Sequence, residues 1–395
     1  MPEHASSVKE ALTFCEHVIP LPANWQPHLP ESGWRNLLMR VLAHLHWPRL
    51  FEFVFGYVHG PSLYWIPPNA ERTALLEHVC SSRSFDVVIC ETMSTVELAP
   101  GTCQAPKVVS LYDIQSEVFR RMRRVDPGAL EDRLFFLPEL LRLRRYEAFH
   151  YRQFDAAITV SSHDKGLLRH MCPQLPSDVV ENGVDTQSLQ PVGGGEDDGC
   201  LAFVASYNYA PNKDAATYFC EYILPLIRAE YSGATLLAVG RDAPAELARY
   251  SGVEVIGTVP DVKPYLVQAS VVVVPLRAGG GTRIKILEAM SMGKAIVSTT
   301  IGAEGLNVEQ GKHLLIADGA ADFAKAVVSL LRDKPRREAL GREGRRLVEA
   351  KYSWDLQAER LERMLLVLAN TGCGTPQQTT LPPNGADTAA QQILS

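Results

Sequence analysis

The 395-residue sequence lacks an excess of positive charge, an apolar leader and a long apolar run. Its 39 Lys and Arg residues stand against 45 Asp and Glu residues, so a surface that wraps nucleic acid is disfavoured. Residues 1–11 are polar, which does not fit a signal peptide. A membrane span needs about 20 consecutive apolar residues, and the best candidate, residues 34–65, is interrupted by Arg40, Glu52 and other polar residues. We therefore expect a soluble or peripheral protein that binds no nucleic acid.

The eight cysteines also lack a pattern that would indicate a metal site. None forms a Cys-x-x-Cys pair, and none is combined with histidine at the spacing of a zinc site. Most lie in apolar runs such as residues 86–90, which is typical of buried free thiols in a reducing cytoplasm. We expect a cytoplasmic protein with no resident metal or other cofactor.

The composition itself is that of a globular protein, with 46% hydrophobic and 21% charged residues and ordinary numbers of glycine (28) and proline (26). These values exclude a disordered or fibrous chain. A domain usually has roughly 100–200 residues, so the length predicts two domains, each able to bury a core of its own.

From residue 200 onward, apolar runs of strand length alternate with helical patterns. The runs are apolar on both faces, as a parallel sheet covered by helices requires. They span residues 201–205, 234–239, 253–259, 271–276, 295–298 and, more weakly, 314–317. Helices are predicted over residues 212–231 with Asn212 as the N-cap, 282–292 with Gly293 just beyond the end, 320–332 and 334–350. This alternation predicts βαβ units and an α/β fold with doubly wound sheets.

The first half shows the same alternation less regularly, with strands predicted at residues 86–90, 107–111 and 155–160 and a long helix over 131–151. The arginines of this helix are expected on a solvated face together with Glu139 and Glu147. A second basic cluster fits either a solvated face, which we favour, or contact with anionic lipid; it consists of Arg120, Arg121, Arg123 and Arg124.

These patterns divide the chain at residues 182–185, shortly before a Gly- and acid-rich stretch at 191–199. Residues 1–184 are expected to form a first Rossmann-like domain and residues 185–350 a second. Residues 351–370 are expected to form a helix that returns toward the first domain. Residues 371–395, rich in Gln, Thr, Pro and Ala, are predicted to be a disordered tail.

The most informative segment is residues 275–288, where a buried strand is followed by three glycines at 279–281 and then by a helix. Backbone N–H groups at a helix start are unpaired and lie at the positive end of the helix dipole, and glycines let a phosphate approach them closely. Thr282, Lys285 and Glu288 recur every three residues and so share one face of the helix. The pattern predicts an anion site; the alternative is a plain turn and a helix with a solvated Lys285–Glu288 pair.

Two cations support the anion site. Arg283 and Lys285 are predicted at an exposed helix start, where positive charge opposes the helix dipole. An anionic ligand between them would reverse that cost. Glu288 lies further along the helix, where its carboxylate is placed to accept hydrogen bonds from sugar hydroxyls.

Six short motifs, each weak alone, follow one another in an order and spacing that resemble one protein family. They are Asn-Gly-Val-Asp at 182–185, Tyr-Ala-Pro-Asn-Lys-Asp-Ala at 209–215, Gly-Thr-Val-Pro-Asp at 257–261, Gly-Gly-Thr-Arg-Ile-Lys-Ile-Leu-Glu-Ala-Met at 280–290, Gly-Ala-Glu-Gly-Leu at 302–306 and Tyr-Ser-Trp-Asp at 352–355. Together they resemble the group 1 retaining glycosyltransferases of family four, which have the two-Rossmann fold called GT-B. The resemblance is closest to bacterial sugar transferases linked to exopolysaccharide and exosortase systems, and it covers residues 86–366.

The resemblance implies a role for each matching residue. Arg283 and Lys285 would neutralise the diphosphate of a nucleotide-sugar donor, and Glu288 would hold the ribose hydroxyls. The base would be held by backbone groups at 257–259, near Arg241; a plain strand end is the alternative for that segment. The full set implied to bind the donor is Gly257, Val259, Arg241, Gly280, Gly281, Thr282 and Glu288.

The sequence departs from the family at three points. The family usually has a glutamate that touches the donor sugar where this chain has Gly280. Many members have a histidine after the strand that matches residues 107–111; here Asp113 takes either a polar catalytic role or, as we favour slightly, the cap of the next helix. The chain also begins near the family's third strand, at residues 14–20, so we expect a first domain short of about two βα units and impaired activity.

The implied reaction is transfer of a sugar, with retention, from a nucleotide-diphosphate donor to a saccharide or lipid-linked acceptor in the synthesis of a cell-surface polysaccharide. Arg283, Lys285 and Asp113 are the expected catalytic residues, since fixed positive groups stabilise charge on a departing diphosphate. Early aromatic residues, Trp25, Trp34, Trp47 and Trp65 among them, suit either core packing, which we favour, or contact with the inner face of the membrane. The main alternative is an inactive nucleotide-binding scaffold; a nucleotide-sugar epimerase and a dehydrogenase rank lower.

Overall fold

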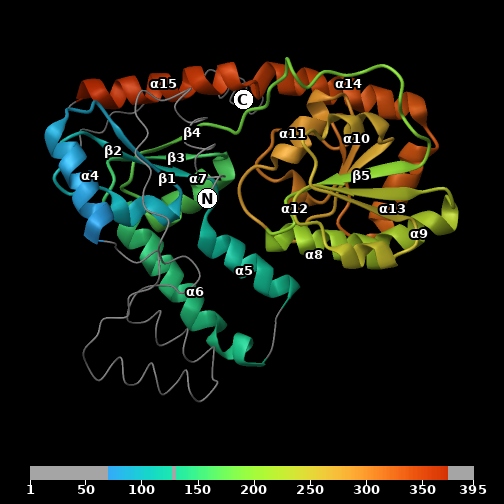
Figure 1. The fold of residues 1–395 in the computed structure, drawn as a ribbon, viewed down its shortest axis with the longest axis horizontal. Coiled ribbons are helices and arrows are strands. Elements are labelled where there is room, and N and C mark those ends of the chain that lie inside the picture. The colour runs from blue at the N-terminus through green and yellow to red at the C-terminus, as the bar shows by residue number, and fades with distance from the viewer. Residues whose placement is uncertain (1–69, 127–129, 372–395) are drawn as a thin grey trace, which may run out of the picture.

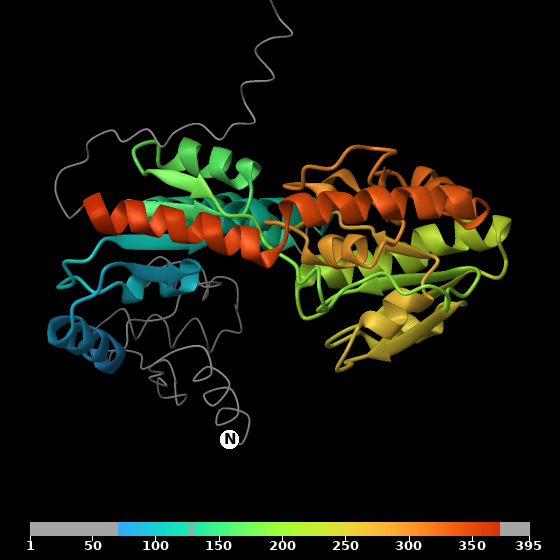
Figure 2. The same ribbon diagram turned by 90° about the horizontal axis from the view of Figure 1, so that it is seen from above.

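The computed structural model describes residues 70–126 and 130–371, which form two α/β domains side by side (Figure 1). Each domain is built on one parallel sheet, and a pair of long C-terminal helices runs along both domains (Figure 2). The predicted α/β class with two doubly wound, Rossmann-like units is therefore confirmed.

The sheet of the first domain has the strand order β1-β2-β3-β4, with every neighbouring pair parallel. The strands are β1 (Val88–Glu91), β2 (Lys107–Leu111), β3 (Ala156–Thr159) and β4 (Ser177–Val179). The first three coincide with the predicted apolar runs. The edge strand β4 was not predicted, because Ser177 and Asp178 give it no apolar run.

The helices of the first domain are α4 (Ala70–Ser82), the short 3₁₀ helix η1 (Met93–Leu98), α5 (Gln115–Val125), α6 (Leu130–Tyr151) and α7 (Ser162–Met171). One face of the sheet packs against η1, α5, α6 and α7 through a core that includes Val109, Phe119, Leu143 and Leu168. The predicted long helix is α6, but its solvated face is only partly as expected. Glu147 is fully buried and Glu139 pairs with Arg142, because this side of α6 faces the domain rather than water.

The sheet of the second domain has the order β10-β9-β8-β5-β6-β7, again all parallel. The strands are β5 (Cys200–Val204), β6 (Thr235–Val239), β7 (Val253–Gly257), β8 (Val271–Val274), β9 (Ile296–Ser298) and β10 (Leu315–Ile316). Six apolar runs were predicted here and all six form strands. The order reverses between β5 and β8, because the chain leaves β5 toward β6 on one side and β8 toward β9 on the other.

The helices of the second domain are α8 (Ala210–Tyr218), the π-helical turn η2 (Phe219–Ile223), α9 (Leu224–Glu230), η3 (Ala245–Arg249), α10 (Lys263–Gln268), α11 (Ile284–Ser291), α12 (Thr300–Ala303), α13 (Ala320–Leu331) and α14 (Lys334–Lys351). Gly293 follows α11 with φ +66°, as predicted for a residue beyond a helix end. The prediction of Asn212 as an N-cap was wrong. The N-cap of α8 is Tyr209, and Asn212 lies inside the first turn, where its amide donates to the Ser206 carbonyl oxygen at 2.7 Å.

Two segments cross between the domains next to each other. The Val184 backbone N–H donates to the Tyr352 carbonyl oxygen at 2.8 Å, and a Cβ added at Gly183 would lie 2.6 Å from the Trp354 ring. Beyond this crossing, α15 (Trp354–Thr371) lies over the other face of the first sheet, where Met364 joins Val108, Ala156 and Ile158 in a small core (Figure 2).

Several predictions can be compared only with the described part of the chain. All six cysteines in it are free, and five of them are buried, as expected. No helix among the described residues is long and apolar enough to cross a membrane. The early tryptophans, the strand expected at residues 14–20, the shortened start and the tail at 371–395 lie outside the described residues, apart from the last residue of α15.

We predict that Gly341→Ala destabilises the protein, because a Cβ at this position in α14 would lie 1.9 Å from the Gly293 carbonyl oxygen. Overpacking against backbone should lower the free energy of unfolding by about 1–3 kcal/mol. The matched control is Gly166→Ala in α7, where a Cβ would meet nothing within 4 Å; this variant should be stabilised by about 0.5–1 kcal/mol. Urea denaturation measures both, and equal midpoints for the two variants would contradict the packing of α14 on α11.

Candidate functional site

The carboxyl ends of β5 and β8 lie where the strand order of the second sheet reverses. In open α/β sheets this switch point is where ligands bind, because the loops leaving the two strands diverge. The loop after β5 leads into α8, and the loop after β8 carries the three glycines and leads into α11. Arg277 of the second loop pairs with Asp214 of α8 at 2.5 and 3.1 Å, which ties the second loop to α8. The predicted segment is thus placed at the expected end of the sheet.

The glycine loop lies directly against the first domain. Gly281 has φ +65°, and a Cβ on it would lie 2.0 Å from the Tyr112 carbonyl oxygen. A Cβ on Gly280 would lie 2.7 Å from Asp113 Cβ and from Val118 Cγ2. The glycines are therefore required for the close approach of the β2–α5 connection, a reason that sequence reasoning missed.

Arg283 is the N-cap of α11 and not part of an exposed first turn. It is only 7% exposed, and its guanidinium donates to the carbonyl oxygens of Gly280 and Gly281 and, at 3.2 Å, of Ile301. Burial lowers the pKa of the guanidinium from its ordinary value. The prediction of an exposed side chain was wrong, because Arg283 folds back and closes the glycine loop.

Lys285 projects from the first turn of α11 toward α8 and β5. Its ammonium donates to Asn212 Oδ1 at 2.6 Å and lies 5.0 Å from the centre of the Phe203 ring. Burial, with a smaller effect from Arg283, lowers the pKa of Lys285 to about 7. The charged form of this side chain therefore lies in a place where water does little to stabilise it, and near neutral pH the charged and neutral forms coexist.

Glu288 lies one turn further along α11. Burial raises the pKa of its carboxyl group, and the nearby Lys285 only partly offsets this effect. Among the described residues no hydrogen bond to its carboxylate is present, and Lys285 bonds to Asn212 instead. The alternative of a solvated Lys285–Glu288 pair is therefore wrong, since neither group is fully solvated and no close ion pair joins them.

Thr282 does not share the environment of Lys285 and Glu288. Its hydroxyl donates to the Val160 carbonyl oxygen of the first domain at 2.9 Å. Nearby, a Cβ on Gly305 would lie 3.0 Å from Ser161 Cβ. In this structure Thr282 joins the two domains.

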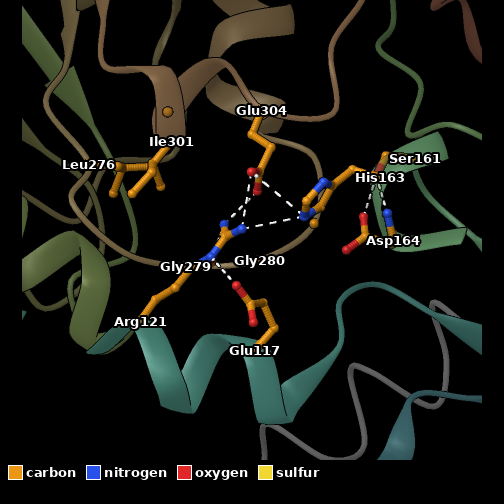
Figure 3. A network of polar contacts seen from close by, with 12 residues as sticks. Glu117, Arg121, Ser161, His163, Asp164, Leu276, Gly279, Gly280, Ile301 and Glu304 are labelled. Atoms are coloured by element: carbon orange, nitrogen blue, oxygen red, sulfur yellow. Dashed lines mark hydrogen bonds and ion pairs between the residues drawn. The ribbon is translucent and has the colours of Figure 1, made fainter. Parts of the chain in front are cut away.

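A charged network crosses the domain boundary beside the glycine loop (Figure 3). Arg121 of α5 contacts both carboxylate oxygens of Glu304, at 2.5 and 3.0 Å, and donates to the Gly279 carbonyl oxygen at 3.1 Å. Its Nε donates to Glu117 at 2.7 Å, and His163 Nε2 lies 3.3 Å from Nη2. The prediction of a solvated face or a lipid contact was wrong for Arg121. In the sequence, the partner of Arg121 was indicated only by the motif at residues 302–306, which contains Glu304.

The residues expected around the base lie at the carboxyl ends of β6 and β7, on the β5 side of the switch point. Gly257 has φ +77° with nothing within 4 Å of an added Cβ, and its carbonyl oxygen accepts from the Gly240 N–H at 2.8 Å. Val259 packs against the small core that contains Leu237 and Val239, and the Arg241 side chain is exposed. Next to Gly257, the segment 257–259 therefore borders open space.

Asp113 does not cap the next helix. The N-cap of α5 is Ile114, which offers no side-chain hydrogen bond. Asp113 accepts instead from Gln115 Nε2 at 2.5 Å and faces Gly280. Burial, reinforced by the negative charge of Asp164, raises the pKa of Asp113 to about 6, although Arg283 acts in the opposite direction. The structure thus places this carboxyl group on the interface between the domains, next to the glycine loop.

Comparison with known proteins agrees with this arrangement. Residues 199–333 match the family model described as Glycosyl transferases group 1. A 107-residue stretch is 32% identical to a GDP-mannose-dependent monoacylated alpha-(1-6)-phosphatidylinositol monomannoside mannosyltransferase of Corynebacterium glutamicum, covering 25% of this chain and 28% of that protein. The chain thus spans about a quarter of the length of this curated relative.

Solved structures extend the similarity to both domains. A sucrose-phosphate synthase of Thermosynechococcus elongatus superposes with a TM-score of 0.63 at 16% identity, covering 78% of this chain and 81% of that one. An Anabaena protein, HepE, solved in complex with UDP, superposes with a TM-score of 0.58 at 14% identity, covering 75% and 82%. The described part of the chain therefore has the GT-B fold, and the resemblance to the group 1 glycosyl transferases is confirmed in its second domain.

Proposed function

We propose that the protein is a glycosyltransferase that moves a sugar from a nucleoside-diphosphate donor to an acceptor hydroxyl with retention. The observation that carries this proposal is the pair Lys285 and Glu288 at the start of α11. Both are ionisable groups at the switch point of the sheet, both are only partly exposed to water, and neither has a fully matching partner. A ligand with a diphosphate and sugar hydroxyls supplies what each group lacks.

The donor would lie along the carboxyl ends of β5, β7 and β8. Its diphosphate would meet the Lys285 ammonium and the N–H groups that begin α11, and Glu288 would accept from the ribose hydroxyls. The open space beside Gly257 suits the base. In the transition state negative charge grows on the departing diphosphate, and a fixed cation that is poorly hydrated stabilises it more than a solvated one would. Asp113, on the opposite domain, would contact a polar group of the reacting sugar.

The acceptor would bind on the side of the first domain, and its chemistry is proposed as a saccharide or a lipid-linked saccharide. The corynebacterial relative is named for a lipid-linked acceptor. In this chain, α6 exposes three leucines at helical spacing, Leu134, Leu137 and Leu141, together with Arg144 and Arg145. Apolar and cationic side chains on one exposed helix suit a peripheral contact with an anionic membrane.

The direct test is calorimetry of the full chain with GDP and UDP, followed by transfer assays with the matching nucleotide sugars and with acceptors free or on anionic vesicles. We expect saturable binding of at least one nucleotide, sugar transfer that persists in the presence of a metal chelator, and the donor's anomeric configuration in the product. Binding without turnover of any donor would favour the scaffold alternative, and no binding at millimolar concentration would contradict the proposal.

Nucleotide binding should also take up a proton at Lys285. The pKa of this side chain is about 7 in the free protein, and a bound diphosphate should raise it. At roughly pH 8 about one proton should therefore enter per nucleotide bound, and the affinity should fall as the pH rises above 7. Titration calorimetry in buffers of different ionisation enthalpy measures this uptake. Lys285→Met should abolish it; the same uptake in wild type and variant would remove Lys285 from the diphosphate site.

Glu288→Ala should weaken nucleotide binding by about 1.5–3 kcal/mol, the value of a hydrogen bond to a charged group. Glu288→Gln keeps an acceptor oxygen and should lose less. Binding of 2′- and 3′-deoxy nucleotides provides the control, because wild type should discriminate against them and Glu288→Ala should not. If both proteins discriminate equally, Glu288 does not hold the ribose.

A further inference from the structure

Helix α5 begins without a capping side chain of its own, since its N-cap Ile114 provides none. The missing acceptor comes from α6. Glu147 is fully buried, and its Oε1 accepts from the Ser116 N–H in the first turn of α5 at 3.3 Å. The Ser116 hydroxyl and the Gln115 N–H also lie near this carboxyl group and act to lower its pKa, against the larger effect of burial. A residue 31 positions away thus satisfies the first turn of α5.

We propose that Glu147 is a positioning residue that fixes the start of α5, and through it Asp113 and Arg121, against the glycine loop of the second domain. The part of this inference that concerns turnover rests on the proposed function. The part that concerns α5 does not.

The cost of burying this group argues that it does more than fill space. Glu147 Oε2 has no hydrogen-bond partner among the described residues, and neither has the hydroxyl of Tyr151, which lies one turn further along α6 and is also fully buried. Burying a carboxyl group with one oxygen unpartnered costs free energy, which an apolar side chain of similar size would not cost. Buried polar atoms without partners are unfavourable for stability, and such exceptions are expected near functional sites.

Helix α5 is the element that needs to be held. Asp113, just before α5, and Val118, within α5, both pack against Gly280. Arg121, further along α5, bonds to Gly279 and Glu304. These contacts lie on one side of a short helix, so a shift or fraying of its first turn moves all of them relative to the loop. The first turn is where Glu147 acts.

The surroundings of Glu147 make glutamine its close substitute. Burial, with a further effect from the charge of Asp113, raises the pKa of Glu147 to about 7, so the neutral form is well populated near neutral pH. The amide of glutamine has the same shape, is neutral and keeps an acceptor oxygen for the Ser116 N–H. Leucine and methionine keep the volume and remove the acceptor.

The experiment compares Glu147→Gln, Glu147→Leu and Glu147→Met with the control Glu97→Leu in the full chain. Glu97 is a partly buried carboxylate that also bonds to α6, through the Tyr146 hydroxyl at 2.6 Å, but it does not cap α5. Hydrogen exchange of residues 115–121 reports the start of α5, thermal melting reports overall stability, and kcat and nucleotide Kd report the site. Two apolar variants are used so that, if one side chain packs poorly and the protein does not fold, the other variant still provides the comparison.

We expect amide exchange in residues 115–121 to rise by about tenfold or more in the Leu and Met variants, with exchange in β2 and β3 unchanged. The kcat should fall by about tenfold or more while nucleotide Kd stays the same, because Lys285 and Glu288 lie on the second domain. Glu147→Gln should restore both, and Glu97→Leu should leave both as in wild type.

Unchanged exchange of α5 in the folded apolar variants would overturn the positioning role, and so would a glutamine variant as defective as leucine. Loss of folding in both apolar variants, with Glu97→Leu still folded, would also overturn it in favour of a purely structural role. A wild-type protein that shows no transfer would instead contradict the proposed function, while the exchange data would still decide the role of Glu147.

Discussion

The arrangement of the two domains depends on one contact between backbone and backbone. Gly281 approaches the Tyr112 carbonyl oxygen so closely that no side chain fits between them, and beside it Gly280 packs against the side chains of Asp113 and Val118. This approach brings the start of α11 to the start of α5. The Thr282 hydroxyl can then reach Val160, and Arg121 can reach Gly279 and Glu304. A side chain in the loop would separate all of these groups together, because they share one rigid turn.

The three cations around this contact have different partners, which separates structural from functional charge. Arg283 is bound by backbone carbonyl oxygens and closes the loop. Arg121 lies between two carboxylates, those of Glu117 and Glu304. Lys285 has an amide oxygen and the face of an aromatic ring, both weaker partners than a carboxylate. Of the three cations, Lys285 would therefore leave its present partners at the least cost for the diphosphate of the proposed donor.

What the sequence predicts well is the set of features that are local in the chain. The strands of the second sheet were predicted because runs such as Val271–Val274 are apolar on both faces, and only burial on both sides accounts for that pattern. The glycine loop was predicted because its residue types, spacing and position after a strand are contained in fourteen residues at 275–288. The fold of the second domain and the position of the glycine loop in it follow from such local patterns.

What the sequence did not predict are the partners that lie far along the chain. Asn212 has the residue type of a helix cap, but its amide serves Lys285, which is 73 positions away. Arg121 belongs to a basic cluster that fits a solvated face until Glu304, 183 positions away, is placed next to it. Glu147 has the spacing of an exposed helix position, and only the packing of α5 on α6 makes it internal. Periodicity predicts on which face of a helix a side chain lies, but it does not predict which other element packs against that face.

At the interface between the domains, burial disfavours the charged form of ionisable groups on both sides. On the first domain, burial raises the pKa of Asp113 and Asp164; on the second, it lowers the pKa of Arg283. Arg283 favours the charged forms of both aspartates, so each domain supplies part of what the other lost on burial. Separating the domains would remove the effect of Arg283 on the two aspartates. The pKa values of the two aspartates are therefore linked to the closeness of the two domains.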